Sequence, residues 1–189
     1  MDRRRNMLIG IVVAVIVVAA SAYATGLTKQ LLRPFRGNAA EYKSSESAAA
    51  PELAEGDWIN SEPLTREGLR GRVVLIEFWT FGCYNCRNTL PYVKGWDARY
   101  RAKGLTVIGV HSPEFDEERK IEHLRRQVAS LGIMYPVVTD NDFQTWKAYN
   151  VEAWPTTFLL DKQGRIRWGH VGEGGYGEAE RLIQKLLAE

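Results

Sequence analysis

The sequence predicts an α/β domain in which a mixed central sheet is flanked by helices. Two apolar, β-branched runs, Val73–Trp79 (VVLIEFW) and residues 105–110 (LTVIGV), have the pattern of strands that are covered on both faces. Apolar residues at helical spacings lie between the two runs, which indicates a parallel strand, helix, strand unit with a right-handed crossover. A strand pair and an amphipathic helix near the C-terminus complete this class of fold.

The remaining elements follow from local signals along the chain. The first helix follows the cysteines and ends at Gly104, and Ser112-Pro113 with the acids after it predicts the start of a second helix that ends before Gly132. The later elements are predicted as a strand at 136–139, a short helix at 143–149, a hairpin with strands at 156–161 and 165–170, and a closing helix over 179–187.

The N-terminal residues have the pattern of an export segment. Residues 7–24 contain no charged side chain, and three arginines stand immediately before them. This length just suffices for a membrane-spanning helix, so we predict a basic flank at 1–6 and an uncleaved transmembrane anchor at 7–26. The small-x-small sequence Ala22-Tyr23-Ala24 leaves a cleaved signal peptide, and hence a secreted protein, as the alternative.

Composition separates a tether from a globular domain. Residues 27–56 include a stretch rich in Ala, Ser and Glu, which predicts a flexible linker, and residues 57–189 form the predicted domain. The formal net charge is +2, and the excess of basic residues lies near the N-terminus; from Asp57 onward there are 18 basic and 18 acidic residues, so the domain gives no electrostatic reason to expect nucleic acid as a partner. We expect a single-pass protein of a bacterial cytoplasmic membrane whose domain lies on the extracytoplasmic side.

Both cysteines of the chain stand three positions apart, in the segment FWTFGCYNCRNTLP. A disulfide between Cys83 and Cys86 would close a very short loop and would stabilise the fold little, so a purely structural disulfide explains the pair poorly. Cys83 is predicted to lie where a strand ends and a helix begins, and unpaired backbone N–H groups favour negative charge there. Cys86 lies within one turn, close enough to resolve a mixed disulfide on Cys83. Half of a zinc or copper site is the alternative, although further ligands are not evident.

The segment around the cysteines resembles the active site of the thioredoxin-like superfamily. Glu77 stands six residues before Cys83, where thioredoxins have a buried acid, and Phe78-Trp79 follows it. Pro91 occupies the position of the proline that kinks the family's helix, although a proline inside an ordinary helix costs about 3 kcal/mol. Trp154-Pro155-Thr156 resembles the family's cis-proline loop. The resemblance extends over about residues 57–189 and implies a thioredoxin fold.

Longer motifs are similar to one branch of that superfamily. The lead-in LRGRVVLIEFW, the extra helix and strand between residues 105 and 143, and the N-terminal segment resemble the membrane-anchored TlpA/ResA-like proteins, with their helix-strand insertion and transmembrane helix. The sequence motifs GVHSPEF, YPVVTDND and GEGGY are most similar to the thioredoxin-like domain of DipZ-type proteins.

Two departures from the family pattern bear on the direction of the reaction. Gly82 precedes Cys83 where many relatives have tryptophan, which predicts a more open site. Tyr84-Asn85 between the cysteines contains no cation, so we expect less thiolate stabilisation than in strong disulfide oxidants. This favours a reducing role.

The resemblance implies a role for each site residue. Cys83 is the expected nucleophile and Cys86 the resolving thiol. Glu77 is the expected proton acceptor for Cys86, with a partly exposed strand glutamate as the alternative. Pro155 is the expected cis-proline, with an ordinary trans proline as the alternative.

Three aromatic side chains are candidates for binding the substrate. Trp79, Tyr84 and Trp154 are the expected docking residues, although Trp79 equally fits the core. His111 at a strand end is expected to be structural.

These observations predict a membrane-tethered thiol:disulfide oxidoreductase that reduces disulfides of exported proteins through a Cys83–Cys86 dithiol cycle. We expect no metal and no cofactor beyond that redox-active disulfide. The resemblance implies protein substrates such as apocytochrome c and a membrane electron donor of the CcdA/DsbD type. The alternatives are a disulfide oxidant or isomerase, which differs in redox potential and not in architecture, or a non-enzymatic copper or zinc carrier.

Overall fold

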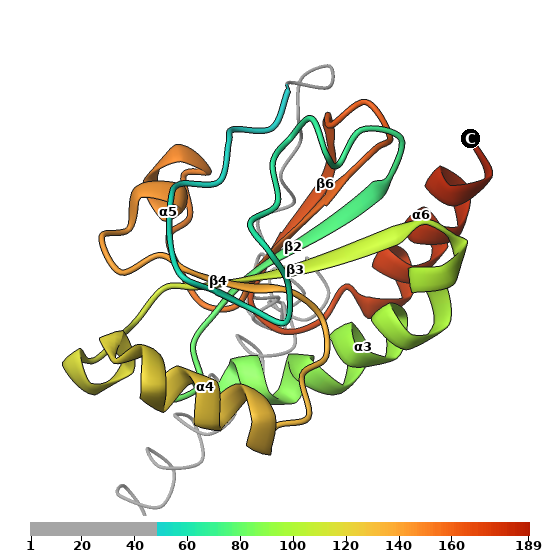
Figure 1. Cartoon of the computed structure of the whole chain (residues 1–189). Coiled ribbons are helices and arrows are strands. Elements are labelled where there is room, and N and C mark those ends of the chain that lie inside the picture. Colours follow the sequence, from blue (N-terminus) through green and yellow to red (C-terminus); the bar gives the residue numbers. More distant parts are fainter. Residues whose placement is uncertain (1–48) are drawn as a thin grey trace, which may run out of the picture. The chain divides into compact units, whose positions relative to one another are not determined.

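A six-stranded sheet forms the centre of the computed structural model, which describes residues 49–189 (Figure 1). In chain order the elements are β1 (Trp58–Ile59), β2 (Val73–Trp79), α3 (Tyr84–Tyr100), the 3-10 helix η1 (Arg101–Lys103), β3 (Leu105–His111), the 3-10 helix η2 (Asp116–Arg119), α4 (Ile121–Ser130), β4 (Val137–Thr139), α5 (Gln144–Ala148), β5 (Thr156–Leu160), β6 (Ile166–Val171) and α6 (Tyr176–Ala188).

The strands are arranged in the order β1-β4-β3-β2-β5-β6. β2 pairs in parallel with β3 and antiparallel with β5, so the sheet is mixed, as the sequence predicted. β2, α3 and β3 form the expected parallel unit, and the cysteines lie at its first turn. The hairpin of β5 and β6 and the closing helix α6 are also confirmed.

Apolar side chains cover both faces of the sheet. Val93 of α3, Leu124 of α4 and Ile183 of α6 pack on one face. α5, through Trp146, and the segment before β2, through Leu69, pack on the other face. Every residue of β2 is therefore buried, which agrees with its continuous apolar run and leaves Glu77 of that strand without access to water.

Two parts of the structure differ from the elements that the sequence predicts. β1 has only two residues, too few for a recognisable pattern. The helix expected from Ser112-Pro113 begins only at Ile121, because Phe115 and Lys120 have extended backbones and only the short η2 lies between them. The acids that suggested a helix start instead belong to this short turn.

The C-terminal end of the predicted linker packs against the domain. Ala50 is buried, and its N–H donates to the Gly164 carbonyl at 2.9 Å. The Ala54 N–H donates to Thr145 Oγ1 at 3.0 Å. Composition alone suggested a tether up to residue 56, because the few apolar side chains that pack here do not form a periodic pattern.

The basic flank at 1–6, the predicted anchor or signal at 7–26 and the linker up to residue 48 lie outside the described residues. Within residues 49–189, no helix combines the length and the apolar character needed to cross a bilayer. The anchor stays a prediction from the sequence.

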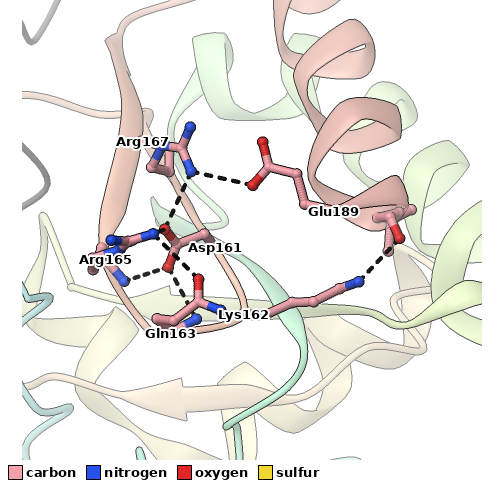
Figure 2. A network of polar contacts seen from close by, with 7 residues as sticks. Asp161, Lys162, Gln163, Arg165, Arg167 and Glu189 are labelled. Atoms are coloured by element: carbon pink, nitrogen blue, oxygen red, sulfur yellow. Dashed lines mark hydrogen bonds and ion pairs between the residues drawn. The ribbon is translucent and has the colours of Figure 1, made fainter.

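A buried carboxylate ties together the hairpin of β5 and β6 (Figure 2). Asp161 is 1% exposed, accepts the backbone N–H groups of Gln163 and Arg165, and forms ion pairs with the side chains of Arg165 and Arg167. Arg167 also reaches Glu189 at 3.3 Å, so the network links the hairpin to the C-terminus. Burial raises the pKa of Asp161, but the hydrogen bonds to Arg165 and Arg167 outweigh it and hold this pKa below its ordinary value.

We predict that Asp161→Asn lowers the free energy of unfolding by about 2 kcal/mol, because the substitution leaves buried donors without a charged acceptor. Chemical denaturation at neutral pH measures this change. Asp116→Asn is the matched control: its side chain is fully exposed and its contact with Arg119 is 3.5 Å, so we expect almost no change. Equal effects of the two substitutions would contradict the role of Asp161.

Candidate active site

The two thiols differ in their access to solvent. Cys83 is the N-cap residue of α3 and is half-buried, whereas Cys86 in the first turn is only 2% exposed. Both are free thiols, and the Cys86 N–H donates to Cys83 Sγ at 3.2 Å. The sulfur of Cys83 is therefore the more accessible of the two, whereas Cys86 is almost fully covered.

Burial controls the protonation of the inner thiol. It raises the pKa of Cys86 far above its ordinary value, and the hydrogen bond to Cys83 and the charge of Glu77 raise it further. A hydrogen bond to the backbone of Thr80 lowers this pKa, but by less. Because a thiol must lose its proton to become a nucleophile, Cys86 needs a nearby group that accepts this proton.

Glu77 is the buried acid that the sequence predicted, with 1% of its surface exposed. Burial raises the pKa of its carboxyl to about 8, and a hydrogen bond from Tyr135 opposes this rise. A carboxyl with such a pKa exchanges protons near neutral pH, as a general acid and base must. The charge interaction between Glu77 and Cys86 shows that the two groups lie within electrostatic reach of each other.

The Trp154–Pro155 peptide bond is cis. Phe78 pairs with Thr156 across β2 and β5, so Pro155 lies beside the end of β2 from which the cysteine loop leaves. Trp154 is half-buried, and its indole N–H donates to the Ser112 carbonyl at 3.0 Å. Both Cys83 and Trp154 pack against the same core cluster.

Two of the three predicted docking side chains are accessible. Tyr84 is 75% exposed directly after Cys83, and Trp154 is partly exposed. Trp79 is only 2% exposed and packs edge-on against His111 in the core. Trp79 is therefore part of the core and does not lie on the surface that a substrate meets, because all of β2 is covered on both faces.

Sequence reasoning missed Glu118, a buried acid that holds the cysteine loop. Its carboxylate accepts the N–H of Gly82 at 3.0 Å and the N–H groups of Glu114 and Phe115. A Cβ at Gly82 would lie 2.3 Å from this carboxylate, so the open position before Cys83 makes room for Glu118. The acidic run around η2 gave no sign of which acid was buried.

His111 has the structural role that the sequence predicted. It is fully buried, its ring stacks on Phe81, and its Nε2 lies 3.3 Å from Thr80 Oγ1. Burial lowers the pKa of His111 to about 4. Among residues 49–189, no three side chains of metal-binding type gather around one point.

The sheet order, the cis-proline loop and the cysteine pair that opens α3 define a thioredoxin-like protein. The chain belongs to the AhpC/TSA family, whose model matches residues 47–169. Within residues 49–189, the structure thus confirms the predicted thioredoxin fold.

Individual relatives agree with this assignment. Protein DipZ of Mycobacterium bovis is 41% identical over 133 residues, which are 69% of this chain but only 19% of DipZ. Thiol-disulfide oxidoreductase YkuV of Bacillus subtilis is 31% identical over 74% of this chain and 94% of its own length. The crystal structure of a thiol-disulfide isomerase from Corynebacterium glutamicum is 31% identical, with a TM-score of 0.66 over 74% of this chain and 97% of that chain.

The chain therefore matches about a fifth of the length of DipZ, and nearly all of YkuV. The resemblance to DipZ-type domains is confirmed, and YkuV, which the chain matches over nearly its whole length, carries the name of a thiol-disulfide oxidoreductase.

We predict that Glu77 makes the stability of the reduced protein fall as pH rises. Between its ordinary pKa of 4.5 and about 8, the folded state holds a proton that the unfolded chain releases. His111 has the opposite effect between about 4 and 6.5, because the unfolded chain takes up a proton there. The two effects cancel between pH 4.5 and 6.5, so the free energy of unfolding falls by about 2 kcal/mol between pH 6.5 and 8.

Denaturant titrations of the reduced protein at several pH values measure this loss. Glu77→Gln should remove the decline between pH 6.5 and 8, whereas Glu55→Gln at an exposed site should keep it. A Glu77→Gln variant that declines as the parent does would show that Glu77 does not hold a proton in the folded state.

Proposed function

We propose that the domain reduces disulfides of exported proteins through a Cys83–Cys86 dithiol cycle. The observation that carries this proposal is the asymmetry of the pair: one accessible thiol at a helix N-terminus, one buried thiol a turn further, and a buried carboxyl in electrostatic reach of the second. This arrangement suits a reaction in two steps with a fixed order of attack.

In the first step, Cys83 loses its proton to solvent and its thiolate attacks one sulfur of the partner's disulfide. The partner's S–S bond breaks, a mixed disulfide forms on Cys83, and the first partner thiolate leaves and takes a proton from solvent. Tyr84, which is exposed directly after Cys83, and the half-buried Trp154 are the side chains that the partner would contact in this proposal.

In the second step, Cys86 gives its proton to the Glu77 carboxylate, and the Cys86 thiolate attacks Cys83. The mixed disulfide breaks, the Cys83–Cys86 disulfide forms, the second partner thiolate takes up a proton from solvent, and Glu77 releases the proton that it accepted to solvent. Overall, the dithiol loses two electrons and two protons, and the partner gains both. The burial of Cys86 supports Glu77 as the acceptor in this proposal, because solvent has little access to the thiol.

Two features support the reducing direction. The residues between the cysteines, Tyr84 and Asn85, contain no cation, and burial disfavours the thiolate of Cys86. Strong oxidants owe their potential to a stabilised thiolate in the reduced form, which this pair does not favour. Each cycle leaves a disulfide that another protein must reduce, and the resemblance points to a membrane donor of the CcdA/DsbD type.

The N-terminal sequence suggests the cellular compartment in which this cycle takes place. An anchor at 7–26 would hold the domain at the extracytoplasmic face of the membrane, near a donor of that type. In an oxidising compartment some exported proteins require free thiols, and apocytochrome c is the client that the resemblance suggests.

Disulfide isomerisation or oxidation is a second candidate. A solved relative that is 31% identical carries the name of a thiol-disulfide isomerase. The same two thiols serve either reaction, and the redox potential of the pair separates the candidates.

We predict that the full-length Cys86→Ser variant accumulates mixed disulfides with client proteins, because it can attack but cannot resolve. Cys83→Ser should trap none, since its remaining thiol is buried. Non-reducing electrophoresis after rapid acid quenching measures the trapped species, and circular dichroism checks that both variants fold. If both variants trap clients to the same extent, the assignment of nucleophile and resolving thiol fails.

A further inference from the structure

A buried tyrosine from another part of the chain contacts the buried acid of the site. Tyr135 precedes β4 and is fully buried, and its hydroxyl donates a hydrogen bond to Glu77 Oε2 at 3.3 Å. Fifty-eight positions separate the two residues along the chain. The catalytic scheme above assigns no role to this hydroxyl.

Gly109 of β3 leaves space for this contact. It pairs with Glu77 across β2 and β3, so it lies between the acid and the segment that carries Tyr135. A Cβ at Gly109 would lie 3.2 Å from the Tyr135 ring and 2.7 Å from Trp79 Nε1. A side chain at position 109 would therefore crowd the Tyr135 ring beside Glu77.

The backbone around Tyr135 is held on both sides. Asn60 Nδ2 donates to the carbonyls of Ile133 and Tyr135, at 3.0 and 3.1 Å. The Gly109 N–H donates to the Pro136 carbonyl at 2.9 Å. Because the backbone is fixed before and after the tyrosine, its hydroxyl has a defined position over Glu77.

Few other titratable groups face this pair. From α3, Cys86 interacts with both Glu77 and Tyr135, and Asp97 interacts with Tyr135. β5 places Thr157, which does not titrate, beside Glu77, and β3 places Gly109 there. Tyr135 thus donates a hydrogen bond to Glu77 from a neutral hydroxyl, whereas the titratable groups nearby, Cys86 and Asp97, carry negative charge when they ionise.

We propose that Tyr135 is a positioning residue that orients the Glu77 carboxylate and stabilises its charged form for proton transfer from Cys86. This inference rests on the proposed function, in which Glu77 takes the proton of the resolving thiol. A hydroxyl that donates to a carboxylate favours the ionised form, so it opposes the effect of burial on the pKa of Glu77. Burial also raises the pKa of Tyr135, which keeps its hydroxyl protonated and able to donate.

The test compares Tyr135→Phe with Tyr149→Phe in the full-length reduced protein. Both tyrosines are buried, but the hydroxyl of Tyr149 donates to the Pro51 carbonyl on the other face of the sheet. Carboxyl ¹³C NMR follows the titration of Glu77, which is identified by its loss in Glu77→Gln. The pH profile of insulin-disulfide reduction provides the second readout.

Tyr135→Phe should move the titration midpoint of Glu77 upward by about one pH unit and move the pH profile of reduction with it. Tyr149→Phe should leave both unchanged. In a Glu77→Gln background, Tyr135→Phe should no longer change the pH profile. An unchanged or lower midpoint, or a shift in the profile that persists in the Glu77→Gln background, would overturn the proposal.

Should Tyr135→Phe fail to fold, the parent protein still tests the contact. The ring ¹³Cζ shift of Tyr135 should then change with the same midpoint as the Glu77 carboxyl and lose that change in Glu77→Gln; no such change would overturn the proposal. Failure of the proposed function looks different: the midpoint moves as expected, but the parent protein reduces no disulfide.

Discussion

The exclusion of water from Cys86 and Glu77 is the constraint on which the site depends. A thiol and a carboxyl that both lie beneath the surface hold their protons more tightly than they would in water. Cys86 is therefore unreactive by itself near neutral pH, whereas Glu77, with a pKa of about 8, exchanges protons there and is the proposed acceptor. Cys83 at the helix tip remains the only sulfur of the pair that a partner can reach first.

The scaffold keeps these groups in place through contacts that are distant in sequence. The parallel pairing of β2 with β3 aligns Glu77 with Gly109, and that glycine admits Tyr135. On the other side, Glu118 binds the backbone N–H just before Cys83, so the insertion also fixes the cysteine loop. The helix-strand insertion thus contacts the site twice, through Tyr135 at Glu77 and through Glu118 at the Gly82 N–H, and so helps to hold the site in place.

Local patterns in the sequence predicted the residues whose chemistry depends on near neighbours. Cys83, Cys86 and Glu77 lie within one strand and one helical turn, and Pro155 was predicted because Trp154-Pro155-Thr156 resembles the cis-proline loop of the thioredoxin-like superfamily. Tyr135 and Glu118 act across long sequence separations, and neither their type nor their spacing distinguishes them from other core or surface residues. The sequence left Trp79 open between the docking surface and the core, because a strand buried on both faces has no alternation to show where each side chain points; in the structure it is buried in the core. The segment at 50–56 packs through isolated apolar residues that composition does not reveal.

The equilibrium potential of the Cys83–Cys86 pair against glutathione tests the central claim most directly, because the burial of Cys86 and the lack of a cation between the two cysteines should leave the thiolate weakly stabilised. The account predicts a two-electron couple more negative than about −200 mV, in the range of glutaredoxins and thioredoxins. A potential near that of the strong oxidants, about −120 mV, would contradict the assignment of a reducing role.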